Sequence, residues 1–147
     1  MTQWRLNTAR TKGNDANINI KANLSGVRST AEVQYDVLGN KYSGTGTAIT
    51  GSDCGTTFTA NTFLADSSAS AALASAKLNN GGTALYCNIN AAGSAYAIAT
   101  VLKGETWWCI DSTGASKGTQ GNGSTGYTAI SGAATAALTD NADMTCN

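Results

Sequence analysis

Histidine is absent from this chain of 147 residues, and charged side chains make up only 12% of it. General acid–base catalysis near neutral pH most often uses histidine, so the commonest catalytic group is missing. The chain also lacks the G-x-S-x-G and S-x-x-K patterns that accompany an activated serine. Its nine acidic residues are scattered, with no pair that suggests an active site. We therefore expect a protein without enzymatic activity and without a cofactor.

A surplus of positive charge is missing as well. Nine basic residues balance nine acidic ones, and no basic run is long enough to follow a phosphate backbone. Nucleic acid is therefore not an expected partner. No apolar run reaches the ~18 residues of a membrane span, and no secretory signal opens the chain. The surface is expected to be rich in small, uncharged residues, as in many exported proteins.

Cysteine is present at four widely separated positions: Cys54, Cys87, Cys109 and Cys146. With no C-x-x-C pair and no histidine, zinc binding and thioredoxin chemistry are both disfavoured. The better interpretation is two disulfides formed in an oxidising compartment. Three pairings are possible, and joining Cys54 to Cys87 and Cys109 to Cys146 closes the shortest loops. We prefer that pairing.

The first quarter of the chain predicts a long amphipathic helix over residues 6–38. Its apolar residues recur at steps of three and four and form one packing face: Ala16, Ile20, Leu24, Val27, Ala31 and Tyr35. Arg28 and Glu32 are placed to pair across one turn, and Gly39-Asn40 ends the helix. The turns before Ile18 carry few apolar residues, so they should project or fray.

The remaining residues predict a single globular unit over 39–147. A long surface loop or loose hairpin is expected over 39–57, and a second helix over 61–78 that packs on a sheet and ends at Gly81-Gly82. Three short strands over 84–89, 95–102 and 106–111 indicate an antiparallel meander. In the middle strand, bulky residues alternate with alanines, and the small face is expected to seat a helix. An exposed loop over 112–126 and a final strand or short helix over 127–147 complete an α+β domain.

Two features near the third strand are candidates for a site. Trp107 and Trp108 are neighbours on a strand and must point to opposite faces. One can join the core; the other is either covered by the C-terminal tail or exposed, where it could stack on a sugar ring or another subunit. Asp111 is expected to cap the following turn by accepting backbone N–H groups. Asp140 and Asp143 offer too few oxygens for calcium, so no metal is expected.

Two segments resemble a known family. The run A-R-T-K-G-N-D-A-N-I (residues 9–18), followed by I-K-A-N-L-S-G-V-R-S-T-A-E-V-Q-Y-D (residues 20–36), resembles the exposed half of the N-terminal helix of bacterial type IV pilins. The run over 95–114, with W-C-I-D-S-T-G near its end, is similar to the central hairpin of pilin heads. The likeness covers residues 6–40 and 54–114.

The resemblance implies a pilin-like fold and a structural function. The chain would be a subunit of an extracellular, cell-surface pilus that serves adhesion, motility or DNA uptake, and its partners would be other pilin subunits bound through the N-terminal helix. A pilin would begin with an apolar half-helix of about 20 residues that enters the membrane, with a glutamate near its start. Met1 to Arg5 stand in its place, so we expect the chain to be the soluble head of such a protein. Two alternatives remain: a type II secretion pseudopilin, and a secreted carbohydrate or cell-surface binding module.

Overall fold

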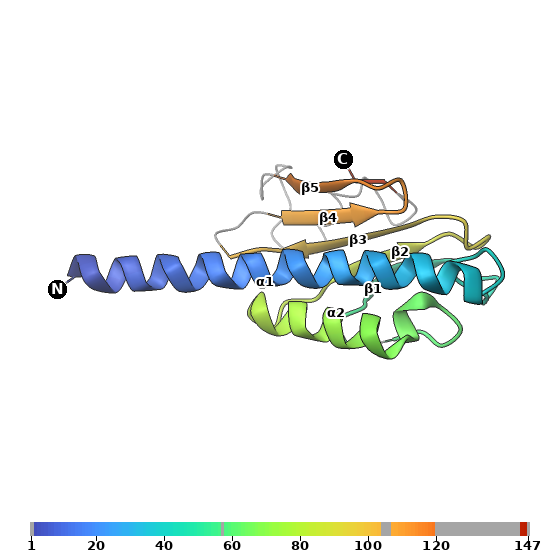
Figure 1. Ribbon diagram of the computed structural model, residues 1–147, viewed down its shortest axis with the longest axis horizontal. Coiled ribbons are helices and arrows are strands. Elements are labelled where there is room, and N and C mark those ends of the chain that lie inside the picture. Colours follow the sequence, from blue (N-terminus) through green and yellow to red (C-terminus); the bar gives the residue numbers. More distant parts are fainter. Residues whose placement is uncertain (1, 57, 104–106, 120–144, 147) are drawn as a thin grey trace.

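The computed structural model of the chain describes residues 2–56, 58–103, 107–119 and 145–146. One long helix, α1 (Thr2–Val37), runs the length of the molecule (Figure 1). A shorter helix, α2 (Ser67–Asn79), lies beside it, and an antiparallel sheet packs against the pair. The architecture is α+β, as the sequence predicts. In Figure 1 the N-terminal part of α1 extends well beyond the sheet and α2.

The buried face of α1 is the one that the apolar spacing indicates. Ile20, Leu24, Val27 and Ala31 are fully buried, while Ala16 and Tyr35 at its ends are partly buried. The helix stops because Gly39 (φ 76°) and Asn40 (φ 65°) take left-handed conformations, in which these two residue types are the most at ease. The N–H of Asn40 then donates to the carbonyl of Tyr35 at 2.8 Å. Helix α1 is therefore continuous through the head and ends sharply.

The second helix is shorter than the sequence predicts. Residues 61–78 are divided into a 3-10 turn, η1 (Phe63–Ala65), and the helix α2. Asp66 separates them because its backbone is extended (ψ 139°) and its carboxylate accepts from the N–H groups of Ser68 and Ala69, which caps α2. Leu78, near the C-terminal end of α2, is 80% exposed.

Helix α2 packs closely on α1, and its buried residues Leu73 and Ala76 also join the core that the helices share with the sheet. Asn23 Nδ2 donates to Ser75 Oγ at 3.1 Å, and Gln34 Nε2 donates to Asp66 Oδ2 at 3.1 Å. The pairing of an early position on α1 with a late one on α2 shows that the helices are antiparallel. The alanines of α2 permit this close approach.

The sheet is a five-stranded meander in the order β1-β2-β3-β4-β5, with every neighbouring pair antiparallel. The three central strands are those expected from the sequence: β2 (Tyr86–Ile89), β3 (Tyr96–Val101) and β4 (Trp107–Asp111). The edge strand β1 (Ile49–Asp53) lies in the segment that we expected to be a surface loop or loose hairpin, and the edge strand β5 (Ser116–Thr119) lies in the expected exposed loop. Both have polar, glycine-containing sequences and are held by backbone pairing, and β1 contains a register shift. Residues 120–144, including the rest of the expected loop and tail, lie outside the described part.

The two faces of the sheet bury different side chains. Tyr96 and Ile98 of β3 face the main core under the helices, whereas Ala97 and Ala99 face a second cluster with Trp107, Cys109 and Cys146. The helices therefore cover the bulky face of β3. This corrects the prediction that a helix would pack on the small face. The bulky side chains supply the apolar area under two helices, while the alanines leave room for an indole ring and a disulfide.

Candidate functional site

Both disulfides pair as the loop lengths favour. Cys54, which follows β1, bonds to Cys87 of β2 in the main core. Cys109 of β4 bonds to Cys146, near the C-terminus, on the opposite face of the sheet. Their Cα–Cα distances are 5.9 and 5.7 Å, and no free cysteine occurs among the described residues. Two buried disulfides indicate an oxidising, extracellular environment.

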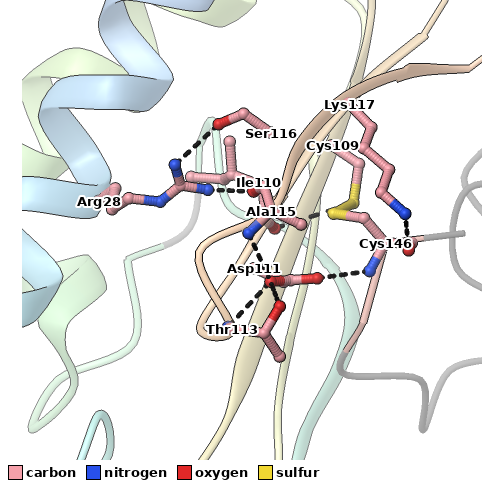
Figure 2. The surroundings of a disulfide bond; sticks show 9 residues. All are labelled: Arg28, Cys109, Ile110, Asp111, Thr113, Ala115, Ser116, Lys117 and Cys146. Carbon is pink, nitrogen blue, oxygen red and sulfur yellow. Dashed lines mark hydrogen bonds between the residues drawn. A yellow bond between two sulfur atoms is a disulfide. The ribbon is translucent and has the colours of Figure 1, made fainter.

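Asp111 organises the end of β4 (Figure 2). One carboxylate oxygen accepts from the Thr113 N–H at 2.9 Å, the Thr113 hydroxyl at 2.6 Å and the Ala115 N–H at 3.2 Å. This turn cap is the role expected from the sequence. The other oxygen accepts from the Cys146 N–H at 2.7 Å, a contact that the sequence did not indicate. Burial alone would raise the pKa of Asp111, but these hydrogen bonds outweigh it and hold the pKa below its ordinary value.

Arg28 fastens α1 to the same turn. Its guanidinium donates to Ser116 Oγ at 2.8 Å and to the carbonyl of Ala115. The expected pair with Glu32 does not form; Glu32 instead accepts from the Tyr42 hydroxyl at 2.8 Å. The turn offers acceptors already fixed by the sheet, so only the Arg28 side chain has to be ordered, whereas an exposed ion pair on the helix orders two long side chains. This cross-link orients α1 over the sheet.

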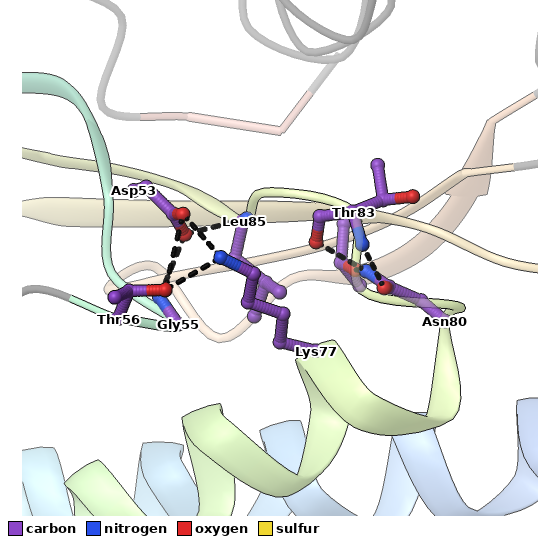
Figure 3. Close-up of polar contacts among 8 residues, drawn as sticks. Asp53, Gly55, Thr56, Lys77, Asn80, Thr83 and Leu85 are labelled. Atoms are coloured by element: carbon purple, nitrogen blue, oxygen red, sulfur yellow. Dashed lines mark hydrogen bonds and ion pairs between the residues drawn. The ribbon is translucent and has the colours of Figure 1, made fainter.

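A second polar cluster fastens α2 to the other end of the sheet (Figure 3). Lys77 Nζ lies 2.6 Å from Asp53 Oδ2, while Asp53 Oδ1 accepts from the N–H groups of Gly55 at 3.0 Å and Leu85 at 3.2 Å. Burial would raise the pKa of Asp53, but Lys77 and these N–H groups together lower it. The carboxylate therefore stays ionised near neutral pH and serves as a structural anchor beside Cys54.

The two tryptophans point to opposite faces of the sheet, as strand geometry requires. Trp107 is 4% exposed and packs in the cluster around Cys109 and Cys146. Trp108 is half-buried against the main core, with Lys21 Nζ 4.6 Å from the centre of its ring. A side chain added at Gly118 would lie 3.6 Å from carbons of the same ring. Trp107 therefore has no open face for stacking on a ligand, and the ring of Trp108 is only partly exposed.

The outer side of α1 carries apolar side chains that have no cover. Ile18, Val33 and Val37 are 63%, 62% and 70% exposed. At ~100° per residue they fall on one side of the helix, together with exposed Ala22 and Gly26. We call these five residues the outer stripe. This stripe was not among the predicted sites, although its residues recur at steps of four and seven, which is also a helical spacing.

Asn17 fastens α1 to the connection between β3 and β4. Its amide donates to the carbonyl of Lys103 at 3.0 Å and accepts from the N–H of the same residue at 2.7 Å. One side chain thus satisfies both backbone groups of a residue in the β3–β4 connection. The Asn17 contact therefore fastens α1 to the head, and the N-terminal part of the helix projects from the head in Figure 1.

Other candidate sites find little support in the described ranges. Within them, no three His, Cys, Asp or Glu side chains gather as a metal site, and no helix is both long and apolar enough to cross a membrane. Asp140 and Asp143 lie outside the described residues. Comparisons with protein-family models, with curated proteins and with solved structures find no match to this chain.

Proposed function

We propose that this chain is the head of a structural subunit of an extracellular, type IV pilus-like filament, and that subunits associate through α1. The observation that carries the proposal is the outer stripe on a helix that also projects from its head. Soluble helices seldom leave several large apolar residues exposed on one side without a partner. A filament of identical subunits supplies that partner many times over.

The charge and the disulfides agree with such a role. A formal charge of zero lets identical heads pack densely without mutual repulsion. Two disulfides, one on each face of the sheet, suit a protein exposed outside the cell. Helix α1 is fastened to its own head by Arg28 and Asn17, so it can transmit load from the projecting segment to the sheet.

The two alternatives rest on weaker ground. A carbohydrate or cell-surface binding module would need an exposed platform, whereas Trp107 is buried and Trp108 is half-buried with Lys21 Nζ over its ring. A type II secretion pseudopilin would assemble through the same helix face, so the outer stripe supports it equally. The hypothesis of a pilus subunit is favoured over that of a pseudopilin because residues 9–36 and 95–114 resemble type IV pilins.

The test places a charge on the outer stripe in the protein as its host makes it. Val33→Asp puts a carboxylate in the middle of the stripe, where it faces solvent in the isolated head and so costs little folding stability. Leu78→Asp is the matched control, because it makes the same kind of change at an exposed apolar residue on α2. Filaments are counted by electron microscopy of material sheared from the cell surface.

We expect Val33→Asp to abolish filaments and Leu78→Asp to leave them intact, with both heads folded. Thermal unfolding of the purified heads verifies the second point. Absence of filaments from cells that export the unaltered protein would overturn the proposal. Normal filaments with Val33→Asp would show that subunits do not associate through this face.

A further inference from the structure

The backbone of Cys146 is held against the sheet by side chains as well as by its disulfide (Figure 2). Its N–H donates to Asp111 Oδ2 at 2.7 Å, and its carbonyl accepts from Lys117 Nζ at 3.4 Å. Both polar groups of one residue are thus occupied by side chains of β4 and β5, in the way that a neighbouring strand would occupy them. The backbone contacts of Cys146 therefore do not involve its sulfur.

The Asp111 contact is the stronger of the two. Asp111 is 1% exposed, and a hydrogen bond to a buried carboxylate is stronger than one between neutral groups. Its Oδ1 is already fixed by Thr113 and Ala115, which follow it directly in the chain. This local turn can form early and hold Oδ2 in position before a segment from far along the chain arrives.

We propose that Asp111 docks the backbone of Cys146 beside Cys109 before their thiols are oxidised, and thereby selects this disulfide over pairings with Cys54 or Cys87. Closing the bond joins the two sulfurs and releases two protons and two electrons. These reduce one glutathione disulfide, the oxidant in the test below, to two glutathione thiols. Asp111 is a positioning residue. It takes no part in the thiol–disulfide exchange and acts by raising the effective concentration of the Cys146 thiol at the Cys109 thiol.

The first experiment measures this concentration effect in the full chain. Asp111→Asn is equilibrated in glutathione buffers at neutral pH, and free thiols are trapped by alkylation and assigned by mass spectrometry. Loss of a hydrogen bond to a charged group corresponds to roughly tenfold or more in an equilibrium constant. We expect that fall for Cys109–Cys146 and less than about a twofold change for Cys54–Cys87. An equal fall in both, or none in Cys109–Cys146, would overturn the proposal.

A matched variant separates docking from the turn itself. Thr113→Val removes the Thr113 hydroxyl contact to Oδ1 but leaves Oδ2 free to accept from Cys146. It should weaken the Cys109–Cys146 bond less than Asp111→Asn does. If the two variants weaken it equally, the carboxylate acts only through the turn and the docking role is wrong.

The second experiment looks for docking in the absence of the bond. In a Cys109→Ser/Cys146→Ser variant, the amide at position 146 should exchange with solvent about tenfold or more slowly than in an unstructured chain, as followed by NMR. Adding Asp111→Asn should remove this protection. Exchange at the unstructured rate before Asp111 is changed would show that the disulfide alone holds the segment.

Discussion

Leu24 provides the sharpest check on the packing of α1. It is fully buried at the centre of the helix face that contacts the main core. Leu24→Ala removes three carbons, which at about 0.8 kcal/mol for each buried methylene corresponds to a loss of about 2.4 kcal/mol. The cavity left behind adds to this, so we expect a loss of about 2.7–5 kcal/mol in the free energy of unfolding.

The matched variant is Val33→Ala on the opposite side of the same helix. Val33 is 62% exposed, so this change removes little buried surface and should alter the unfolding free energy by no more than about 0.5 kcal/mol. Both changes in unfolding free energy would be measured by urea unfolding with the disulfides intact, followed by circular dichroism. If Leu24→Ala costs under about 1 kcal/mol, or if Val33→Ala costs as much as it does, the assignment of buried and outer faces is wrong.

Three further predictions concern single residues. Gly26→Ala should raise the unfolding free energy by about 1 kcal/mol, measured by urea unfolding, because an added Cβ meets no atom within 4 Å and alanine favours the helix. Lys77→Met should raise the pKa of Asp53, measured by NMR titration, and cost about 1 kcal/mol or less in unfolding free energy because the pair is partly solvated. The lowered pKa of Asp111 means that the unfolded chain binds this proton more readily, so its contribution to stability is present above about pH 4 and is lost as the pH falls through the folded pKa. Urea unfolding at a series of pH values should show this acid loss, and Asp111→Asn should reduce it; an unchanged acid profile would contradict that assignment.

Local pattern in the sequence was sufficient for the main elements. The steps of three and four that place Ile20, Leu24 and Val27 on one side set the buried face of α1, because a helix repeats every 3.6 residues whatever surrounds it. Alternation and β-branched content located the three central strands for a similar reason. Loop length alone favoured the observed disulfide pairing, since short loops close at the lowest entropic cost.

The edge strands could not be predicted from local sequence patterns. Strand β1 has the sequence ITGSD and strand β5 has SKGT, neither of which shows an apolar alternation. They exist because their backbone groups pair with β2 and β4, which become available only once the sheet has assembled. The local sequence of an edge strand does not indicate which strand will pair with it.

The same division applies to the candidate sites. The sequence by itself determined which residues are apolar, which are cysteines and where α1 and the three central strands lie, because these depend on neighbours along the chain. Only the tertiary structure decided that Arg28 would reach Ala115 and not Glu32, that Asp111 would hold Cys146, and that the helices would cover the bulky face of β3. These choices compare contacts between distant segments, and a hydrogen bond or packing contact acquires its energy only when the fold brings both partners together and excludes water.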